Sequence, residues 1–171
     1  MVYYQLCANC LINDVNNCYT YLSAVADVCG VVDVPVLDIN TDINMGALSL
    51  IPEVYKQQKN SVPESYEKIS SFALDDCDIP HADLVKIDVE GMEFDVLKGA
   101  RMLLKKSKFP PVIFELWREG GIRNPERKEN LLKLLKDELG YDVFRKDQLC
   151  VAYHSGNVAV FDHELHELHK I

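Results

Sequence analysis

KIDVEGMEFDVLKGA, residues 86–100, holds the end of a strand, a sharp turn and the start of a helix. The short apolar run Leu84–Asp88 that leads into it is typical of a buried strand in a parallel sheet. Gly91 permits the turn. From Met92 to Lys106 apolar residues recur at helical spacing, and basic residues gather at the C-terminal end, where the helix dipole favours them. The stretch therefore predicts a strand, turn and helix unit of the kind that builds α/β proteins.

Three carboxylates follow this strand within a few residues: Asp88, Glu90 and Glu93. Open α/β sheets bind ligands at the carboxyl ends of their strands, which is where Asp88 is expected. The helix N-terminus that follows stabilises nearby acids through its free N–H groups and its dipole. Acids also occur here simply as helix-entry residues, and spacing alone does not separate the two roles. In a site they would serve as a general base, bind a divalent cation or hold a substrate hydroxyl.

The flanking sequence continues the alternation of helices and strands. Upstream, the patterns predict a helix at Tyr3–Asn13, strands at Tyr19–Ala26 and Val31–Ile39, and a long polar loop over 41–65 with a short helix near Glu53–Lys59.

Downstream, a continuous apolar run predicts a buried strand at Val112–Leu116. A helix is expected to begin at Pro125 and to end at Gly140. Strands at Tyr141–Arg145 and Asn157–Phe161 complete the pattern. The predicted fold is therefore α/β, with an antiparallel strand pair at the C-terminal end and a single domain over residues 1–171.

Composition and charge narrow the classes of function. The chain has 171 residues, 48% of them hydrophobic and 26% charged, which fits one globular domain. Its net charge of -9 disfavours a nucleic-acid partner. No apolar stretch approaches the roughly 20 residues that cross a bilayer. The first residues show no basic region and no small-residue cleavage site, so we expect no signal peptide, no membrane contact and a cytoplasmic location.

The six cysteines are expected to be reduced thiols, because no secretory signal accompanies them. Cys7 and Cys10 form a C-x-x-C, which raises a zinc or redox alternative. A zinc site would need a second pair at regular spacing, whereas Cys18 and Cys29 are eleven positions apart. The helical pattern places Cys7 and Cys10 beside apolar residues, so we expect core packing and no metal site.

The central stretch, followed by a strand ending in FELW (Phe114–Trp117), resembles the signature of the FkbM-type methyltransferases, which are class I enzymes dependent on S-adenosylmethionine. Weaker similarity runs upstream through Ala24–Asp27 and Ser71–Asp75. The resemblance covers about Leu6–Trp117. It implies a Rossmann-like class I methyltransferase sheet and, in the intact form, O-methylation of a sugar or another small-molecule hydroxyl.

The resemblance also implies roles for individual residues. Asp88 is expected to deprotonate or orient the acceptor hydroxyl, and Glu90 and Glu93 come second, as ligands of the acceptor or of a metal. Glu115, at a strand end next to the site, is a candidate to hold the acceptor or a metal, although glutamates at strand ends are as often solvated edge residues. Trp117 is a candidate to line the acceptor, with packing as the alternative role. The complete expected site is Asp88, Glu90 and Glu93 for catalysis, Ala24, Val25, Ala26, Asp27 and Asp88 for the cofactor, and Glu115 and Trp117 for the acceptor.

Two strands of the family pattern have no counterpart in this sequence. The family begins with a strand, a Gly-rich turn and a second strand that ends in an acid for the ribose, whereas none of the eight glycines here forms a G-x-G. The sequence therefore indicates a domain without its first two strands, which should bind S-adenosylmethionine weakly or not at all. The alternative function is a catalytically inactive remnant that acts as a binding or interaction module.

The two missing strands have a consequence for the sheet. In class I methyltransferases they lie between the third and fourth strands, so their loss leaves a gap of roughly 10 Å. We expect Tyr19–Ala26 to pair directly with Leu84–Asp88, or else the N-terminal third to pack poorly. Open strand edges invite pairing with other chains, which favours a homo-oligomer.

Overall fold

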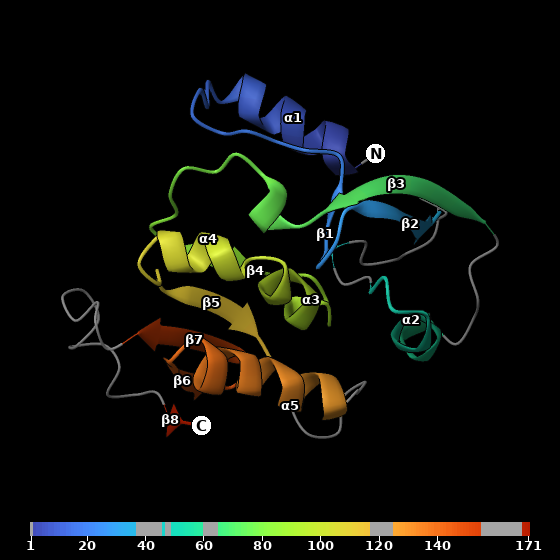
Figure 1. The fold of residues 1–171 in the computed structure, drawn as a ribbon. Helices are drawn as coiled ribbons and strands as arrows, with labels where there is room; N and C mark the ends of the chain where they lie inside the picture. The colour runs from blue at the N-terminus through green and yellow to red at the C-terminus, as the bar shows by residue number, and fades with distance from the viewer. Residues whose placement is uncertain (1, 37–45, 47–48, 60–64, 117–124, 155–168) are drawn as a thin grey trace.

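The computed structural model describes residues 2–36, 46, 49–59, 65–116, 125–154 and 169–171. It confirms a mixed α/β structure, whose strands form two separate sheets in the described residues (Figure 1). The helices are α1 (Val2–Ile12), α2 (Pro52–Lys59), α3 (Glu93–Lys98), α4 (Arg101–Lys106) and α5 (Pro125–Lys133). The strands are β1 (Ala24–Val25), β2 (Gly30–Pro35), β3 (Tyr66–Phe72), β4 (Val85–Ile87), β5 (Val112–Glu115), β6 (Tyr141–Lys146), β7 (Leu149–His154) and β8 (His169–Lys170).

The N-terminal sheet has the strand order β1-β3-β2. β3 runs antiparallel to β2 along the full length of β2 and parallel to the short strand β1. The sequence patterns did not predict β3, because its residues YEKISSF are mostly polar and only Ser71 is fully buried. The strand expected over Tyr19–Ala26 is wrong in extent, since only Ala24 and Val25 pair in the sheet.

The second sheet has the order β4-β5-β7-β6-β8. β4 and β5 are parallel, whereas β7 is antiparallel to both of its neighbours, β5 and β6. The expected antiparallel pair near the C-terminus is therefore confirmed in kind. Its second strand is β7, at Leu149–His154, and the range 157–161 predicted for it lies outside the described residues.

One face of the second sheet carries the main hydrophobic core. Alternate residues of β5, β6 and β7 are fully buried there: Val112, Phe114, Val143, Cys150 and Ala152. They pack against apolar residues of α3, α4, α5 and the π-helical turn Leu134–Glu138, namely Leu97, Leu104, Leu131, Leu134 and Leu135. The residues between them on β5 and β7 are only half-buried, so the alternation of an antiparallel sheet replaces the doubly covered strand expected at β5.

The first 36 residues contribute little to this core. α1 buries none of its residues, and Leu11, Ile12 and Tyr19 are among the exposed apolar side chains. Direct pairing of β1 with β4 is wrong, because the two strands belong to different sheets. The other expectation, a poorly packed N-terminal third, is confirmed for α1. None of the described helices is both long and apolar enough to cross a membrane.

The helix expected over Met92–Lys106 is divided into α3 and α4 at Gly99. The division has a tertiary cause. The Asp75 carboxylate accepts hydrogen bonds from the backbone N–H groups of Met102 (3.0 Å) and Leu103 (2.7 Å), and the Asp75 N–H donates to the Gly99 carbonyl (2.8 Å). Asp75 thus caps α4 from outside, and these contacts compete with a continuous helix.

Gly99 also lets the N-terminal sheet approach the helices. A Cβ atom at this position would lie 2.3 Å from the Ala26 carbonyl oxygen and 3.0 Å from the Asp27 Cα. The backbone φ of Gly99 is -83°, which any residue adopts, so space alone requires the glycine. The end of β1 therefore lies directly against the junction of α3 and α4.

Candidate functional site

The turn between β4 and α3 forms the centre of the site. Asp88 follows the last residue of β4, and the chain then passes through two left-handed residues, Glu90 (φ 49°) and Gly91 (φ 101°). A positive φ is common for glycine and unusual for glutamate, so the backbone at Glu90 is held in a strained conformation. The two residues turn the chain back sharply, and α3 begins at Glu93.

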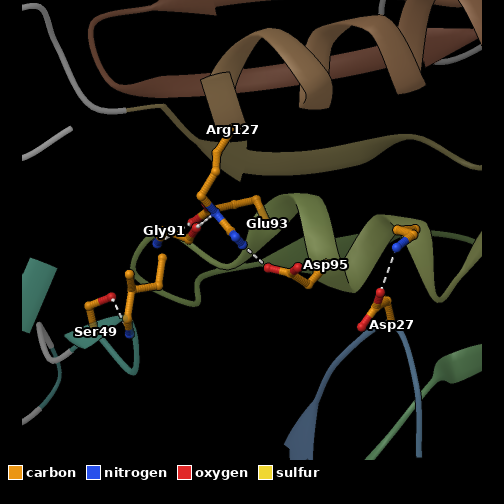
Figure 2. A network of polar contacts seen from close by, with 8 residues as sticks. Asp27, Ser49, Gly91, Glu93, Asp95 and Arg127 are labelled. Carbon is orange, nitrogen blue, oxygen red and sulfur yellow. Dashed lines mark hydrogen bonds and ion pairs between the residues drawn. The ribbon is translucent and has the colours of Figure 1, made fainter. Parts of the chain in front are cut away.

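Glu93 lies inside this turn, with only 7% of its surface exposed. Its Oε1 accepts a hydrogen bond from the Gly91 N–H at 3.1 Å (Figure 2). Burial raises the pKa of Glu93, while the backbone N–H groups and the positive charge of Arg127 act in the opposite direction. The carboxyl group therefore stabilises the turn from within and is not placed to meet a substrate.

Four carboxylates gather at the carboxyl edge of the second sheet. Ile87 of β4 is paired with Phe114 of β5, so the next residue of each strand, Asp88 and Glu115, lie at the same edge. Burial is the main cause that raises the pKa of Glu90, and the charges of Asp88, Glu115 and Glu93 raise it further. The structure thus brings together the three acids expected for catalysis and Glu115, which was expected to hold the acceptor.

Asp88 is the most open of the three predicted catalytic acids. Its side chain is 56% exposed and forms an ion pair with Lys86, with 2.9 Å between Oδ2 and Nζ. An exposed pair of this kind contributes little to stability because water and salt screen it. The carboxylate is accessible to a ligand.

Arg127, from α5, joins this turn to the C-terminal half of the chain. Its Nε donates to the Gly91 carbonyl oxygen at 3.3 Å, and its Nη2 donates to the Asp95 carboxylate (Figure 2). Sequence reasoning selected neither residue. Asp95 lies within the central stretch as one of two acids in the first turn of α3. No spacing pattern connects Arg127 to a turn so distant in the sequence.

The segment expected to face the cofactor lies at the end of β1. Ala24 and Val25 are half-buried, and Ala26 is buried. The Asp27 carboxylate accepts a hydrogen bond from Lys98 of α3 at 2.7 Å, and this contact is the main cause that lowers the pKa of Asp27 (Figure 2). Asp27 is therefore already engaged by α3. Trp117, expected near the acceptor, lies outside the described residues.

An open hollow of about 540 Å³ borders the same edge of the sheet, at the turn between β6 and β7. Its lining includes Gln148 and Leu149. Leu149 is paired with Glu115, and the Gln148 carbonyl oxygen accepts a hydrogen bond from the Leu116 N–H at 2.7 Å. Asp88, Glu115 and the hollow therefore follow one another along the carboxyl edge of the second sheet.

A comparison with protein families identifies the family of this chain. A model of the methyltransferase FkbM domain matches residues 2–143 of the 171-residue chain. The chain belongs to the FkbM methyltransferase family. A search of curated proteins and a search of solved structures found no match. The matched part of the FkbM domain extends from α1 into β6, so it includes the end of β1, the carboxylate turn and Arg127.

Clustered acidic side chains can also hold a metal ion, so this FkbM domain raises the question of a metal site. In the part of the chain that the structure describes, no group of three or more His, Cys, Asp or Glu side chains is arranged to hold a metal ion.

The raised pKa of Glu93 predicts a pH-dependent contribution to the stability of the FkbM domain. Between the ordinary value of 4.5 and the higher folded value, the folded state holds more protons than the unfolded state, so this contribution falls as pH rises. Glu93→Gln removes the charge and keeps an oxygen for the Gly91 N–H. We expect this variant to have a higher free energy of unfolding than the wild type at neutral pH, with a smaller advantage near pH 4.5.

Urea denaturation at a series of pH values measures this difference. Glu67→Gln is the matched control, because Glu67 is exposed on β3, and it should shift stability by less than about 0.5 kcal/mol at every pH. A Glu93→Gln advantage that stays constant with pH would contradict the assignment.

Proposed function

We propose that this domain transfers a methyl group from S-adenosylmethionine to a hydroxyl oxygen of a small molecule such as a sugar. The observation that carries the proposal is the meeting of Asp88, Glu90 and Glu115 at one edge of a sheet in a domain of the FkbM family. The open hollow beside Glu115, of about 540 Å³, leaves room for part of an acceptor at the same edge.

The described residues fit one part of S-adenosylmethionine. Half-buried Ala24 and Val25 offer an apolar surface suited to the adenine ring, and the acids after β4 suit hydroxyl and ammonium groups. Packing of Ala26 against Gly99 limits how deeply the adenine could enter there. The sequence holds no G-x-G turn for the amino-acid end of the cofactor. When bound, the cofactor supplies a methyl group on a positively charged sulfur.

The chain's own residues would position and activate the acceptor. Asp88, exposed at the strand end, accepts the hydrogen bond of the acceptor hydroxyl and then its proton. Glu90, beside Asp88 and Glu115, would accept a hydrogen bond from a second hydroxyl of the acceptor. Glu115 and the hollow would hold the rest of the molecule. Proximity and orientation would provide most of the rate enhancement.

The negative charge at this edge selects among acceptors. The carboxylates at Asp88, Glu90 and Glu115 repel phosphates, so the proposal favours a neutral, hydroxyl-rich acceptor over nucleic acid.

The location and the oligomeric state are also part of the proposal. We propose that the reaction takes place in the cytoplasm. We expect a homo-oligomer in which a second copy pairs along the edge of β4 that faces away from β5. In the described residues no strand pairs with that edge.

Calorimetric titration with S-adenosylmethionine tests the proposal on this chain. Because the described residues fit only one part of the cofactor, we expect saturable binding with a Kd on the order of 0.1–1 mM. S-adenosylhomocysteine should bind with similar affinity. ATP has the same adenosine group, but its triphosphate meets the carboxylate edge, so ATP is the matched control and should not bind.

Two results would count against the proposal in different ways. No binding of either S-adenosyl compound up to millimolar concentration would contradict methyl transfer by this chain and favour the interaction module. Equal binding of ATP would indicate a general adenosine site and contradict the role given to the carboxylates.

A further inference from the structure

The segment that follows α1 folds back along the helix. The Val15 N–H donates to the Cys10 carbonyl oxygen at 2.9 Å, and the Tyr3 hydroxyl donates to the Thr20 carbonyl oxygen at 3.4 Å. The Cys7 Sγ lies 3.3 Å from the Thr20 Oγ1. These three contacts hold residues 15–20 against α1. They follow the helix from its C-terminal end towards its N-terminal end.

This return path brings three thiols together. Cys18 lies between Val15 and Thr20 and is near enough to Cys10 to act on its thiol, as is Cys7, one helical turn from Cys10. The Cys18 contact is the main cause that raises the pKa of Cys10. Cys18 is exposed, and Cys7 and Cys10 are partly exposed, so small reagents can reach the group.

We propose that Cys10 and Cys18 are a site of reversible oxidative modification, at which a small disulfide such as oxidised glutathione converts the two thiols into an intramolecular disulfide. The exposed Cys18 thiolate attacks one sulfur of oxidised glutathione and releases one glutathione thiolate. Cys10 then loses its proton and attacks the Cys18 sulfur, which releases the second glutathione. Two protein thiols and one glutathione disulfide thus give one protein disulfide and two glutathione thiols.

Geometry favours Cys10 with Cys18 over the C-x-x-C pair. Cys7 and Cys10 are three residues apart on a helix, where Cβ atoms are about 5–6 Å apart, while a disulfide needs about 3.5–4.5 Å. Joining these two would distort α1. Joining Cys10 to Cys18 links two segments that hydrogen bonds already hold together in the reduced protein.

The other three cysteines lie elsewhere and provide internal controls. Cys29 donates to the Asp76 carboxylate at 3.2 Å, and Cys77 donates to the Ala73 carbonyl oxygen at 3.4 Å. Cys150 is fully buried in the core, and burial raises the pKa of its thiol to about 11. Of these three, only Cys29 is exposed.

Mass spectrometry after treatment with oxidised glutathione tests the proposal. Free thiols are blocked with N-ethylmaleimide, and the protein is then cleaved with chymotrypsin, because the first Lys or Arg of the chain is Lys56 and trypsin would leave these cysteines in one peptide. Cleavage after Leu11 and Tyr19 separates Cys10 from Cys18. We expect one cross-linked pair of peptides that joins them and is lost on reduction.

Four variants identify the partners. Cys7→Ser and Cys29→Ser should keep the cross-link, and Cys7→Ser is needed because Cys7 and Cys10 fall on one chymotryptic peptide. Cys10→Ser should instead accumulate the glutathione mixed disulfide at Cys18, and Cys18→Ser should lose the cross-link. A cross-link that survives Cys10→Ser, or wild-type protein that accumulates the Cys18 mixed disulfide as readily as Cys10→Ser, would overturn the proposal.

Discussion

Gly99→Ala is expected to lower the free energy of unfolding by about 2–3 kcal/mol. The added methyl group would lie 2.3 Å from the Ala26 carbonyl oxygen and 3.1 Å from the Ala73 Cβ. The nearest neighbour is backbone, which cannot rotate away as a flexible side chain would. Either β1 or the junction of α3 and α4 must therefore move. Urea denaturation followed by circular dichroism measures the loss.

Gly30→Ala is the matched control for this substitution. A Cβ atom there would meet the Ser71 Oγ at 3.5 Å, an ordinary van der Waals distance. We expect a change within about 0.5 kcal/mol. Equal stability of Gly99→Ala and Gly30→Ala would show that the end of β1 does not press against Gly99 in solution.

Asp88→Asn is expected to lower kcat for methyl transfer by about 10²–10⁴-fold, the usual contribution of a positioned general base. The amide has nearly the shape of the carboxylate and still accepts a hydrogen bond, but it cannot take the acceptor proton at neutral pH. The affinity for S-adenosylmethionine should change much less than kcat, because Asp88 acts on the acceptor in this mechanism. Transfer of a labelled methyl group, with calorimetry in parallel, separates the two effects.

Asp83→Asn is the control, because Asp83 precedes β4 and its side chain is 96% exposed beside His81. Its kcat should equal that of the wild type. If Asp88→Asn kept the wild-type kcat, another group would be the base, and Glu90 would be the next candidate. If instead the cofactor affinity fell as far as kcat, Asp88 would belong to the cofactor site.

Local sequence signals were sufficient for the centre of the fold. Residues that are close in the sequence determine β4, the turn at Gly91 and the start of α3. One short stretch of sequence is therefore enough to predict all three. The same is true of α5, which begins at Pro125 as expected. The three acids were predicted for the same reason, since Asp88, Glu90 and Glu93 are fixed by that turn.

Long-range contacts account for what the sequence could not predict. The break between α3 and α4 depends on Asp75, which lies 27 residues before Met102 in the chain. The missed strand β3 is stabilised by pairing with β2, because its own residues are mostly polar. Arg127 has no local signal at all, since its partners are defined only once α5 packs against α3.

The contact between Arg127 and Gly91 also bears on synthesis of the protein. The two residues are 36 positions apart, so the carboxylate turn leaves the ribosome well before the arginine that braces it. β4 then still lacks its neighbour β5, whose residues also follow the turn in the chain. The acids therefore reach their final positions only after α5 has left the ribosome. Until then the nascent chain contains the residues of this edge, but the edge is not yet folded.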